Sequence, residues 1–204
     1  MKNLSNDTLP WSVAILIDST FLNRSSLHGE NIHRFNHGKG FIIGHRWTNI
    51  VLIINNTVIP LPPIEFYTKK YCKDNNIEYV TENEAIIEYL KKLNLNEYIG
   101  RHDPKKIVVM GDSAYDDKRI ENIIKDKKWS FVMSLKKKRS VKSEHKFNFK
   151  PKSHGWCGVD IFFKNHRRLK WQTIRVKPNG VKKNDWNIVS DILSDTFDML
   201  EKLG

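Results

Sequence analysis

Residues 12–20 read SVAILIDST, an apolar run of the length of a β-strand that reaches the acidic residue Asp18. A similar run at residues 106–111, KIVVMG, is followed directly by Asp112. Continuous runs of apolar and β-branched residues are typical of strands that are buried on both faces of a sheet. We therefore expect two central strands, each with an aspartate at its carboxyl end.

The regions around these two runs alternate between strand and helix patterns. β-branched runs separated by Asn55-Asn56 indicate an antiparallel meander after the first strand. A Thr81-x-x-Glu84 capping box, followed by apolar residues at helical spacing, predicts the first helix. The expected elements are strands at residues 41–43, 49–54, 57–61 and 129–135 and helices at residues 81–93 and 116–128. Antiparallel strands followed by parallel crossovers predict an α/β fold with a mixed sheet.

The sequence divides into three parts. Residues 12–135 hold the expected α/β core. Residues 136–180 form a basic linker and a small β-hairpin extension, whose strands are expected at residues 159–163 and 171–176. Residues 184–204 carry apolar residues at helical spacing, so we expect a C-terminal amphipathic helix there.

Positive charge is concentrated in one part of the chain. The sequence carries 35 Lys and Arg against 23 Asp and Glu, a formal net charge of +12. Residues 125–183 alone have 19 Lys and Arg against 3 Asp and Glu, a local net charge of +16, whereas residues 1–124 are neutral. A concentrated basic segment is typical of a protein that binds a polyanion such as nucleic acid. The alternative is a solvated, lysine-rich surface.

The composition argues against several other classes of protein. Hydrophobic residues make up 39% of the chain, which is enough for a packed core. The longest apolar runs are far shorter than the ~20 residues that a membrane-spanning helix needs, and the first residues lack the apolar core of a secretory signal. Cys72 and Cys157 form no Cys-x-x-Cys pair, so neither a disulfide framework nor a zinc knuckle is indicated. We expect a cytoplasmic protein with no membrane partner.

Asp18 and Asp112 are the leading candidates for a catalytic metal site. Ligands collect at the carboxyl ends of strands in open α/β sheets, so the two carboxylates are expected to meet. Neighbouring carboxylates repel unless protons or cations lie between them, and a pair of Mg²⁺ or Mn²⁺ ions is a common arrangement for phosphoryl transfer. The alternative is that each aspartate caps the turn or helix that follows its strand.

Several of these segments together resemble a DDE-type insertion-sequence transposase. They are ILIDST, Gly38-Lys39-Gly40, the stretch VVMGDSAYDDKRIENIIKDKKWSFVMSLKKKRSVK and the basic hairpin, and the resemblance covers residues 12 to about 177. It implies a ribonuclease H-like fold that cleaves and joins DNA strands. It also implies two Mg²⁺ or Mn²⁺ ions held by two aspartates and one glutamate, with double-stranded transposon ends as the partner and a homodimer on the DNA. The two aspartates correspond to Asp18 and Asp112.

The sequence departs from this family in two respects. The family's glutamate lies on a late helix, commonly within a Tyr-x-x-Arg-x-x-x-Glu arrangement, and this sequence contains none; at Tyr98-x-x-Arg101 the required position holds Lys105. Glu201 is the one candidate of the right type on the expected last helix, and the alternative for it is a surface charge. Only 17 residues precede Asp18, where the family usually has a DNA-end-binding region. We therefore expect a truncated copy.

Two clusters of basic residues are expected to bind DNA. The first follows strand 129–135 directly, and the second lies at the tip of the hairpin beside aromatic residues. Lys and Arg bind backbone phosphates with little regard to base sequence and with a strong dependence on salt. The alternative for the hairpin is a charged edge that resists aggregation. The candidate DNA-binding residues are Lys136, Lys137, Lys138, Arg139, Lys142, Arg167, Arg168 and Lys170.

Two other interpretations stay open. MGDSAYDD also resembles the late Gly-Asp-x-x-x-Asp element of haloacid-dehalogenase-like phosphatases, but those enzymes need a second aspartate two residues after the first, where this sequence has Thr20. The non-enzymatic alternative is a DNA-binding remnant that keeps the fold and the basic surface without the third carboxylate. Four histidines between His28 and His45 show no tight metal-site spacing beyond His33-x-x-x-His37.

Overall fold

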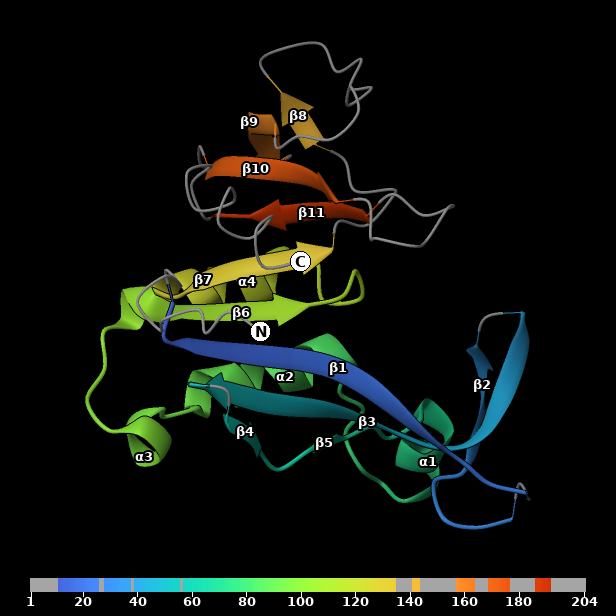
Figure 1. Cartoon of the computed structure of the whole chain (residues 1–204). Coiled ribbons are helices and arrows are strands. Elements are labelled where there is room, and N and C mark those ends of the chain that lie inside the picture. The colour runs from blue at the N-terminus through green and yellow to red at the C-terminus, as the bar shows by residue number, and fades with distance from the viewer. Residues whose placement is uncertain are drawn as a thin grey trace, which may run out of the picture.

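The computed structural model of the chain describes residues 11–25, 28–37, 39–55, 57–134, 141–143, 157–163, 169–176 and 186–191 (Figure 1). The strands are β1 (Val13–Asn23), β2 (His33–His37), β3 (Gly40–Ile54), β4 (Thr57–Pro60), β5 (Ile64–Glu65), β6 (Ile107–Gly111), β7 (Ser130–Ser134), β8 (Val141–Ser143), β9 (Cys157–Phe163), β10 (Leu169–Val176) and β11 (Trp186–Ser190). The helices are α1 (Lys69–Asp74), α2 (Glu82–Lys92), α3 (Asn96–Ile99) and α4 (Lys118–Asp126), with a 3₁₀ turn η2 (Pro104–Lys106).

These strands form one mixed sheet, which confirms the expected α/β class. Its order is β2-β3-β1-β6-β7-β11-β10-β9-β8, and β4 and β5 also pair with β3. β1 is antiparallel to β3 and parallel to β6, and β6 is parallel to β7. Antiparallel strands therefore come first along the chain and parallel crossovers follow, as the sequence predicts.

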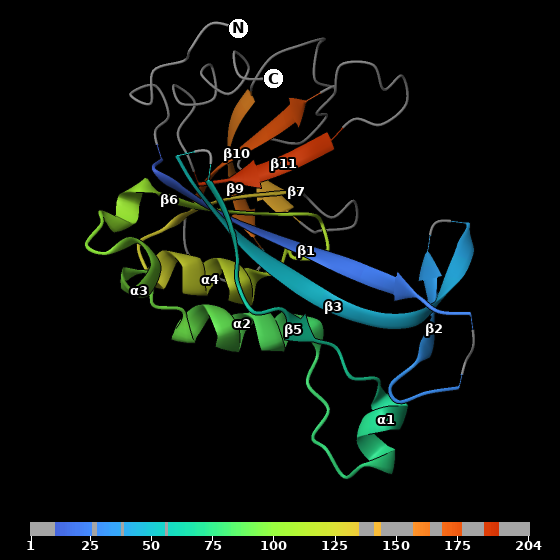
Figure 2. The same ribbon diagram turned by 60° about the horizontal axis from the view of Figure 1, so that its bottom comes forward.

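Helices α2 and α4 cover one face of the central strands (Figure 2). Ile86 and Leu90 of α2 and Ile120 and Ile124 of α4 are fully buried in the main hydrophobic core. They pack there with odd-numbered residues of the strands, such as Ile15, Val109 and Phe131. Among the described residues, the opposite face has a much smaller buried cluster, made of Ala14, Val108 and Val132. The described part of the core therefore lies mainly on the face that α2 and α4 cover.

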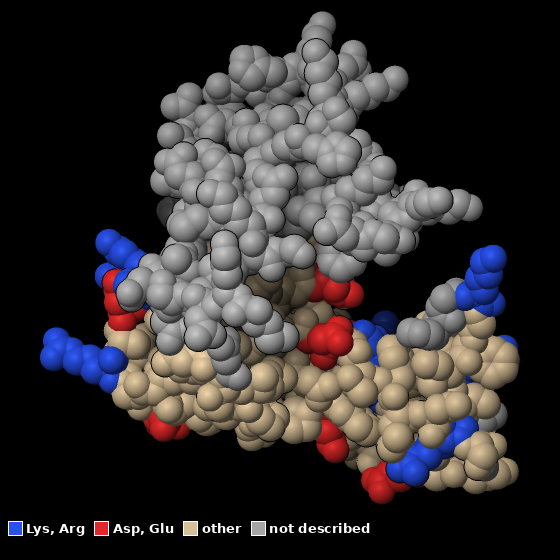
Figure 3. Space-filling model, in the orientation of Figure 1, with Lys and Arg blue, Asp and Glu red and all other residues tan. Residues whose placement is uncertain are grey.

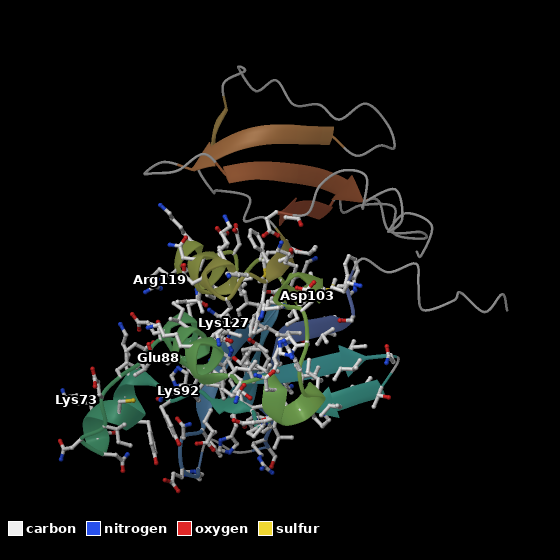
Figure 4. The ribbon with its side chains drawn as sticks, turned by 90° about the vertical axis from the view of Figure 1, so that its left-hand side faces the viewer. Lys73, Glu88, Lys92, Asp103, Arg119 and Lys127 are labelled. Atoms are coloured by element: carbon white, nitrogen blue, oxygen red, sulfur yellow. The ribbon has the colours of Figure 1, made fainter. Side chains whose placement is uncertain are left out.

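Helix α2 begins where the sequence predicts. Thr81 accepts a hydrogen bond from the Glu84 backbone nitrogen (3.4 Å), and Glu84 Oε2 accepts one from the Thr81 backbone nitrogen (2.9 Å), which completes the capping box. The exposed sides of α2 and α4 carry charges of both signs, including Glu88, Lys92 and Arg119 (Figure 4). This helical surface is therefore not basic.

The strands β1 and β3 are longer than the sequence suggests. They pair from Val13↔Ile54 to Asn23↔Gly44, and β2 joins the far end of β3. Together with β2, the far halves of β1 and β3 make an arm, residues 20–47, that extends from the body of the sheet (Figure 1). At Gly44, φ is +155° and an added Cβ would lie 1.8 Å from the Leu22 carbonyl oxygen, so only glycine allows the strands to approach this closely.

The expected C-terminal helix at residues 184–204 is wrong at its start. Residues 186–190 form β11, which pairs with β7 and with β10, in antiparallel fashion. Without β11, the outer edge of β7 would leave backbone groups unpaired, and the neighbouring β-branched residues Ile188 and Val189 favour a strand. Residues 192–204, including Glu201, lie outside the described residues.

The expected hairpin is confirmed for its backbone. β9 and β10 pair antiparallel, and β11 connects them to β7, so the hairpin continues the core sheet. The hairpin tip, residues 164–168, lies outside the described residues. Within the part of the chain that the structure describes, no helix is long and apolar enough to cross a membrane.

Candidate functional site

The structure brings the two predicted aspartates to adjacent positions. Ile17 of β1 is the Cα partner of Gly111 of β6 in a parallel pair. Asp18 and Asp112 are the next residues along the two chains, so they lie side by side on neighbouring central strands, Asp18 within β1 and Asp112 directly after β6. Both residues are exposed. The expected end of a strand is confirmed for Asp112, which directly follows β6, and is wrong for Asp18, because β1 continues to Asn23 in its pairing with β3. The catalytic role of the pair stays a prediction.

The two carboxylates belong to the face of the sheet that the helices leave uncovered. Successive residues of a strand face opposite sides, so Asp18 shares its face with Ala14 of the smaller buried cluster. Asp112 continues the alternation of β6 and follows Val108 of the same cluster. In Figure 3, acidic side chains gather at the notch between the arm and the body of the sheet. The two exposed carboxylates therefore lie on the face that α2 and α4 do not cover.

Asp112 also serves the turn that follows its strand. Its Oδ1 accepts a hydrogen bond from the Ala114 backbone nitrogen (2.7 Å). Among the described residues, Asp112 Oδ2 has no hydrogen-bond partner, and neither does the carboxylate of Asp18. The N-cap of α4 is Asp117 and not Asp112, since Asp117 accepts from the Arg119 backbone nitrogen (2.8 Å). One function of Asp112 is therefore structural, and one oxygen is free for a ligand.

A third carboxylate, that of Glu82, lies on the helix-covered side of the sheet. Glu82, at the start of α2, accepts hydrogen bonds from Ser19 Oγ (2.5 Å), Thr48 Oγ1 (2.7 Å) and the Tyr115 hydroxyl (3.2 Å). It also forms an ion pair with Arg46, which in turn donates to Ser19 Oγ (3.1 Å). Burial raises the pKa of Tyr115, so its hydroxyl stays protonated at neutral pH. We call these five residues the Glu82 network.

The Glu82 network holds in place the backbone segments that carry Asp18 and Asp112. Ser19 follows Asp18 directly, and Tyr115 belongs to the turn after Asp112, where its backbone nitrogen donates to the Asp112 carbonyl (3.2 Å). The network thus connects β1, β3, α2 and the turn after β6. Sequence reasoning missed it because its members are 2 to 96 positions apart, and only the first-turn glutamate after the capping box gave a weak signal.

The donor set of the open pair suits a hard divalent cation. Exposed carboxylate oxygens are what Mg²⁺ and Mn²⁺ prefer, and Mg²⁺ commonly keeps several water ligands while it is held by one or two carboxylates. Asp18 and Asp112 are the residues that would hold such an ion. Within the described residues, no three His, Cys, Asp or Glu side chains gather around one metal position. Glu201, the one candidate for a third ligand, lies outside these residues.

Most of the predicted DNA-binding residues lie outside the described part of the chain. This applies to Lys136, Lys137, Lys138, Arg139, Arg167 and Arg168. Lys142 is in β8 and Lys170 is in β10, where only the backbone is described. β7 ends at the same edge of the sheet as Asp112, because Met133 is the Cα partner of Gly111 in a parallel pair. Ser134, the last described residue before the basic linker, therefore lies at the same end of its strand as Asp112.

A further buried acidic cluster lies where α4 meets β7 and β11. Glu121 is fully buried, and this burial raises its pKa to about 8 although Lys125 opposes the shift. Asp191 Oδ1 accepts from the Phe131 backbone nitrogen (2.8 Å), and burial raises its pKa as well. The expected C-terminal helix at residues 184–204 would include Asp191, and this is wrong because residues 186–190 form β11 against β7.

Comparison with known proteins finds no protein-family model that matches this sequence and no curated protein that it matches.

Proposed function

We propose that this chain carries the catalytic core of a DDE-type transposase, which cleaves and joins DNA strands with the help of divalent metal ions. The observation that carries the proposal is the side-by-side position of Asp18 and Asp112 after Ile17 and Gly111, on neighbouring parallel strands. Their carboxylates are exposed and belong to the uncovered face of the sheet. This is a position that DNA can reach.

The sheet order supports the ribonuclease H-like part of the proposal. The central strands run in the order β4-β3-β1-β6-β7, with antiparallel pairs first and two parallel pairs after β1. α2 and α4 both pack on one face. The first aspartate lies within β1 and the second directly follows β6, and these are two neighbouring central strands of the sheet.

In this proposal, each group of the chain has a defined task. Asp18 and Asp112 hold Mg²⁺ or Mn²⁺, and the bound metal would supply electrophilic assistance to attack on the phosphodiester. The Glu82 network keeps the backbone at both aspartates in place. The basic linker, which follows β7, contacts the phosphates of double-stranded DNA. Two copies of the chain act on the paired transposon ends.

A catalytically inactive DNA-binding remnant is the second candidate. The observation that favours it is the lack, among the described residues, of a third acidic side chain beside Asp18 and Asp112. The phosphatase alternative is less well supported, because β1 pairs with the antiparallel β3 that follows it and no helix comes directly after β1. The transposase core and the DNA-binding remnant predict different results in the same assay.

The test is nicking of supercoiled plasmid by the full chain in Mg²⁺ and in Mn²⁺. We compare the natural sequence with Asp18→Asn, Asp112→Asn and the control Asp74→Asn, which removes an exposed carboxylate from the end of α1. Loss of nicking by about 100-fold or more in the first two variants, with no loss in the control, supports the proposal. Salt-dependent DNA binding without nicking supports the remnant instead. The absence of both overturns the DNA function.

A further inference from the structure

The arm holds a pocket that the proposed catalytic site does not use. It is an open cavity of about 420 Å³ lined mainly by polar residues at the far end of β1 and in the loop that follows. Arg24, His28 and His45 contribute nitrogen-bearing side chains, and Glu30 contributes the one carboxylate. Guanidinium and imidazole groups around an open cavity favour an anion as the ligand.

This pocket lies on the same face of the β1–β3 ribbon as Asp18. Residues directly opposite in an antiparallel pair share a face, and the pairs Asp18↔Asn49, Thr20↔Trp47 and Leu22↔His45 follow one another along the ribbon. Arg24 continues this series, because its backbone nitrogen donates to the Ile43 carbonyl (2.7 Å). A polymer that lies along this face therefore reaches both the two aspartates and the pocket.

The arm is held firmly, so the pocket is formed before any ligand arrives. Phe35 packs against Phe21 (5.3 Å between ring centroids) and against Phe66 (6.0 Å). Asn31 Nδ2, beside the pocket, donates to the Phe66 carbonyl (2.9 Å). These contacts connect the arm to the segment between β5 and α1. A preformed site loses less conformational entropy on binding.

The charge of the arm also favours an anion. Residues 21–47 contain four Lys and Arg but a single acidic residue, Glu30. The carboxylate of Glu30 accepts a hydrogen bond from the Tyr71 hydroxyl, which partly satisfies it. Arg24 is exposed, and its guanidinium makes no hydrogen bond or ion pair with any described residue.

We propose that this pocket binds one backbone phosphate of the DNA strand that is cleaved at Asp18 and Asp112. This proposal rests on the proposed function. Six residues separate Asp18 from Arg24, which is about 20 Å along a strand. DNA rises about 3.4 Å per nucleotide, so the phosphate in the pocket is about six nucleotides from the cleaved one. The pocket thus sets the register of the strand at the catalytic pair.

The first experiment measures duplex binding by fluorescence anisotropy over a salt series, with the full chain. Arg24→Ala removes one phosphate contact, so the slope of log K against log salt is expected to fall by about 0.9. Arg34→Ala is the matched control: Arg34 is also an exposed cation of the arm, but it lies over the Phe41 ring (3.6 Å) and outside the pocket. We expect its slope to stay close to that of the natural sequence. Equal slopes for both variants overturn the proposal.

The second experiment locates the phosphate. Single methylphosphonate linkages, which are uncharged, are placed along the duplex. The natural chain is expected to lose affinity at one linkage, about six nucleotides from the phosphate that is cleaved. Arg24→Ala is expected to be insensitive to that linkage and normally sensitive to the others. Equal sensitivity of both proteins at every linkage overturns the proposal.

Two further results distinguish the DNA-phosphate pocket from a site for a free anion and from the proposed catalytic activity. Inorganic phosphate that shifts the NMR signals of His45, while Arg24→Ala leaves DNA binding unchanged, marks a small-anion site and overturns the DNA assignment. An Arg24-dependent salt slope in a chain that never nicks DNA supports the pocket and contradicts the catalytic proposal. Normal nicking with an Arg24-independent slope does the reverse.

Discussion

The carboxylates on the two faces of the central sheet differ in their burial and in their hydrogen bonding. On the helix-covered face, Glu82 is largely buried, with 13% of its side chain exposed, and is satisfied by Ser19, Thr48, Tyr115 and Arg46. On the opposite face, Asp18 and Asp112 are exposed, and the described residues supply one hydrogen bond to the pair, from the Ala114 backbone. A satisfied carboxylate stabilises the fold, and two neighbouring unsatisfied ones are available for a cation.

The largest expected effect concerns the satisfied face. Glu82→Ala leaves Arg46 and three hydroxyl groups without their shared acceptor, so we expect the free energy of unfolding to fall by about 3 kcal/mol. Denaturant unfolding measures this change. Glu88→Ala on the same helix is the control, because Glu88 is exposed and pairs only with Lys91. Its expected cost is below about 0.5 kcal/mol, and similar costs for both variants contradict the comparison.

The next effect concerns pH. The folded-state pKa of Glu121 is raised to about 8, above its unfolded value of 4.5, so the folded chain binds more protons than the unfolded chain between these values. The contribution of Glu121 to stability is therefore largest at low pH and is lost as the pH rises from 4.5 to about 8. Glu121→Gln should flatten this dependence and raise the free energy of unfolding at pH 8 by about 1 to 2 kcal/mol.

Thermal unfolding across this pH range checks the second prediction. Glu97→Gln, an exposed residue of α3, is a suitable control because it should leave the pH profile unchanged. A Glu121→Gln profile as steep as that of the natural chain would show that Glu121 is ionised in the folded state.

The smallest effect on stability is expected on the open face. Asp112→Asn keeps an oxygen that accepts from the Ala114 backbone nitrogen and removes one of two neighbouring like charges. Without metal, the melting temperature should therefore stay the same or rise by a degree or two. With Mg²⁺, the melting temperature of the natural chain should rise and that of Asp112→Asn should not. A clear loss of stability without metal would assign Asp112 a purely structural role.

Local sequence signals predicted the central part of the fold because they are strong there. The capping box of Thr81 and Glu84 marks the start of α2, and the apolar runs mark β1, β6 and β7. The same signals predicted that Asp18 and Asp112 would each end a strand, which holds for Asp112 and is wrong for Asp18, because β1 continues to Asn23. They failed at residues 186–190, because apolar spacing over such a short segment fits a helix and a strand equally well.

The sequence by itself determined the α/β class, the order of the central elements and the two central strands that carry Asp18 and Asp112. The tertiary structure decided the continuous β3, the arm, the strand β11 and the Glu82 network, because these depend on which backbone edges and buried polar groups meet. Gly44 illustrates the difference: its need for glycine arises from the Leu22 carbonyl, 22 positions away. Periodicity is a local property, whereas pairing and polar satisfaction are properties of the folded whole.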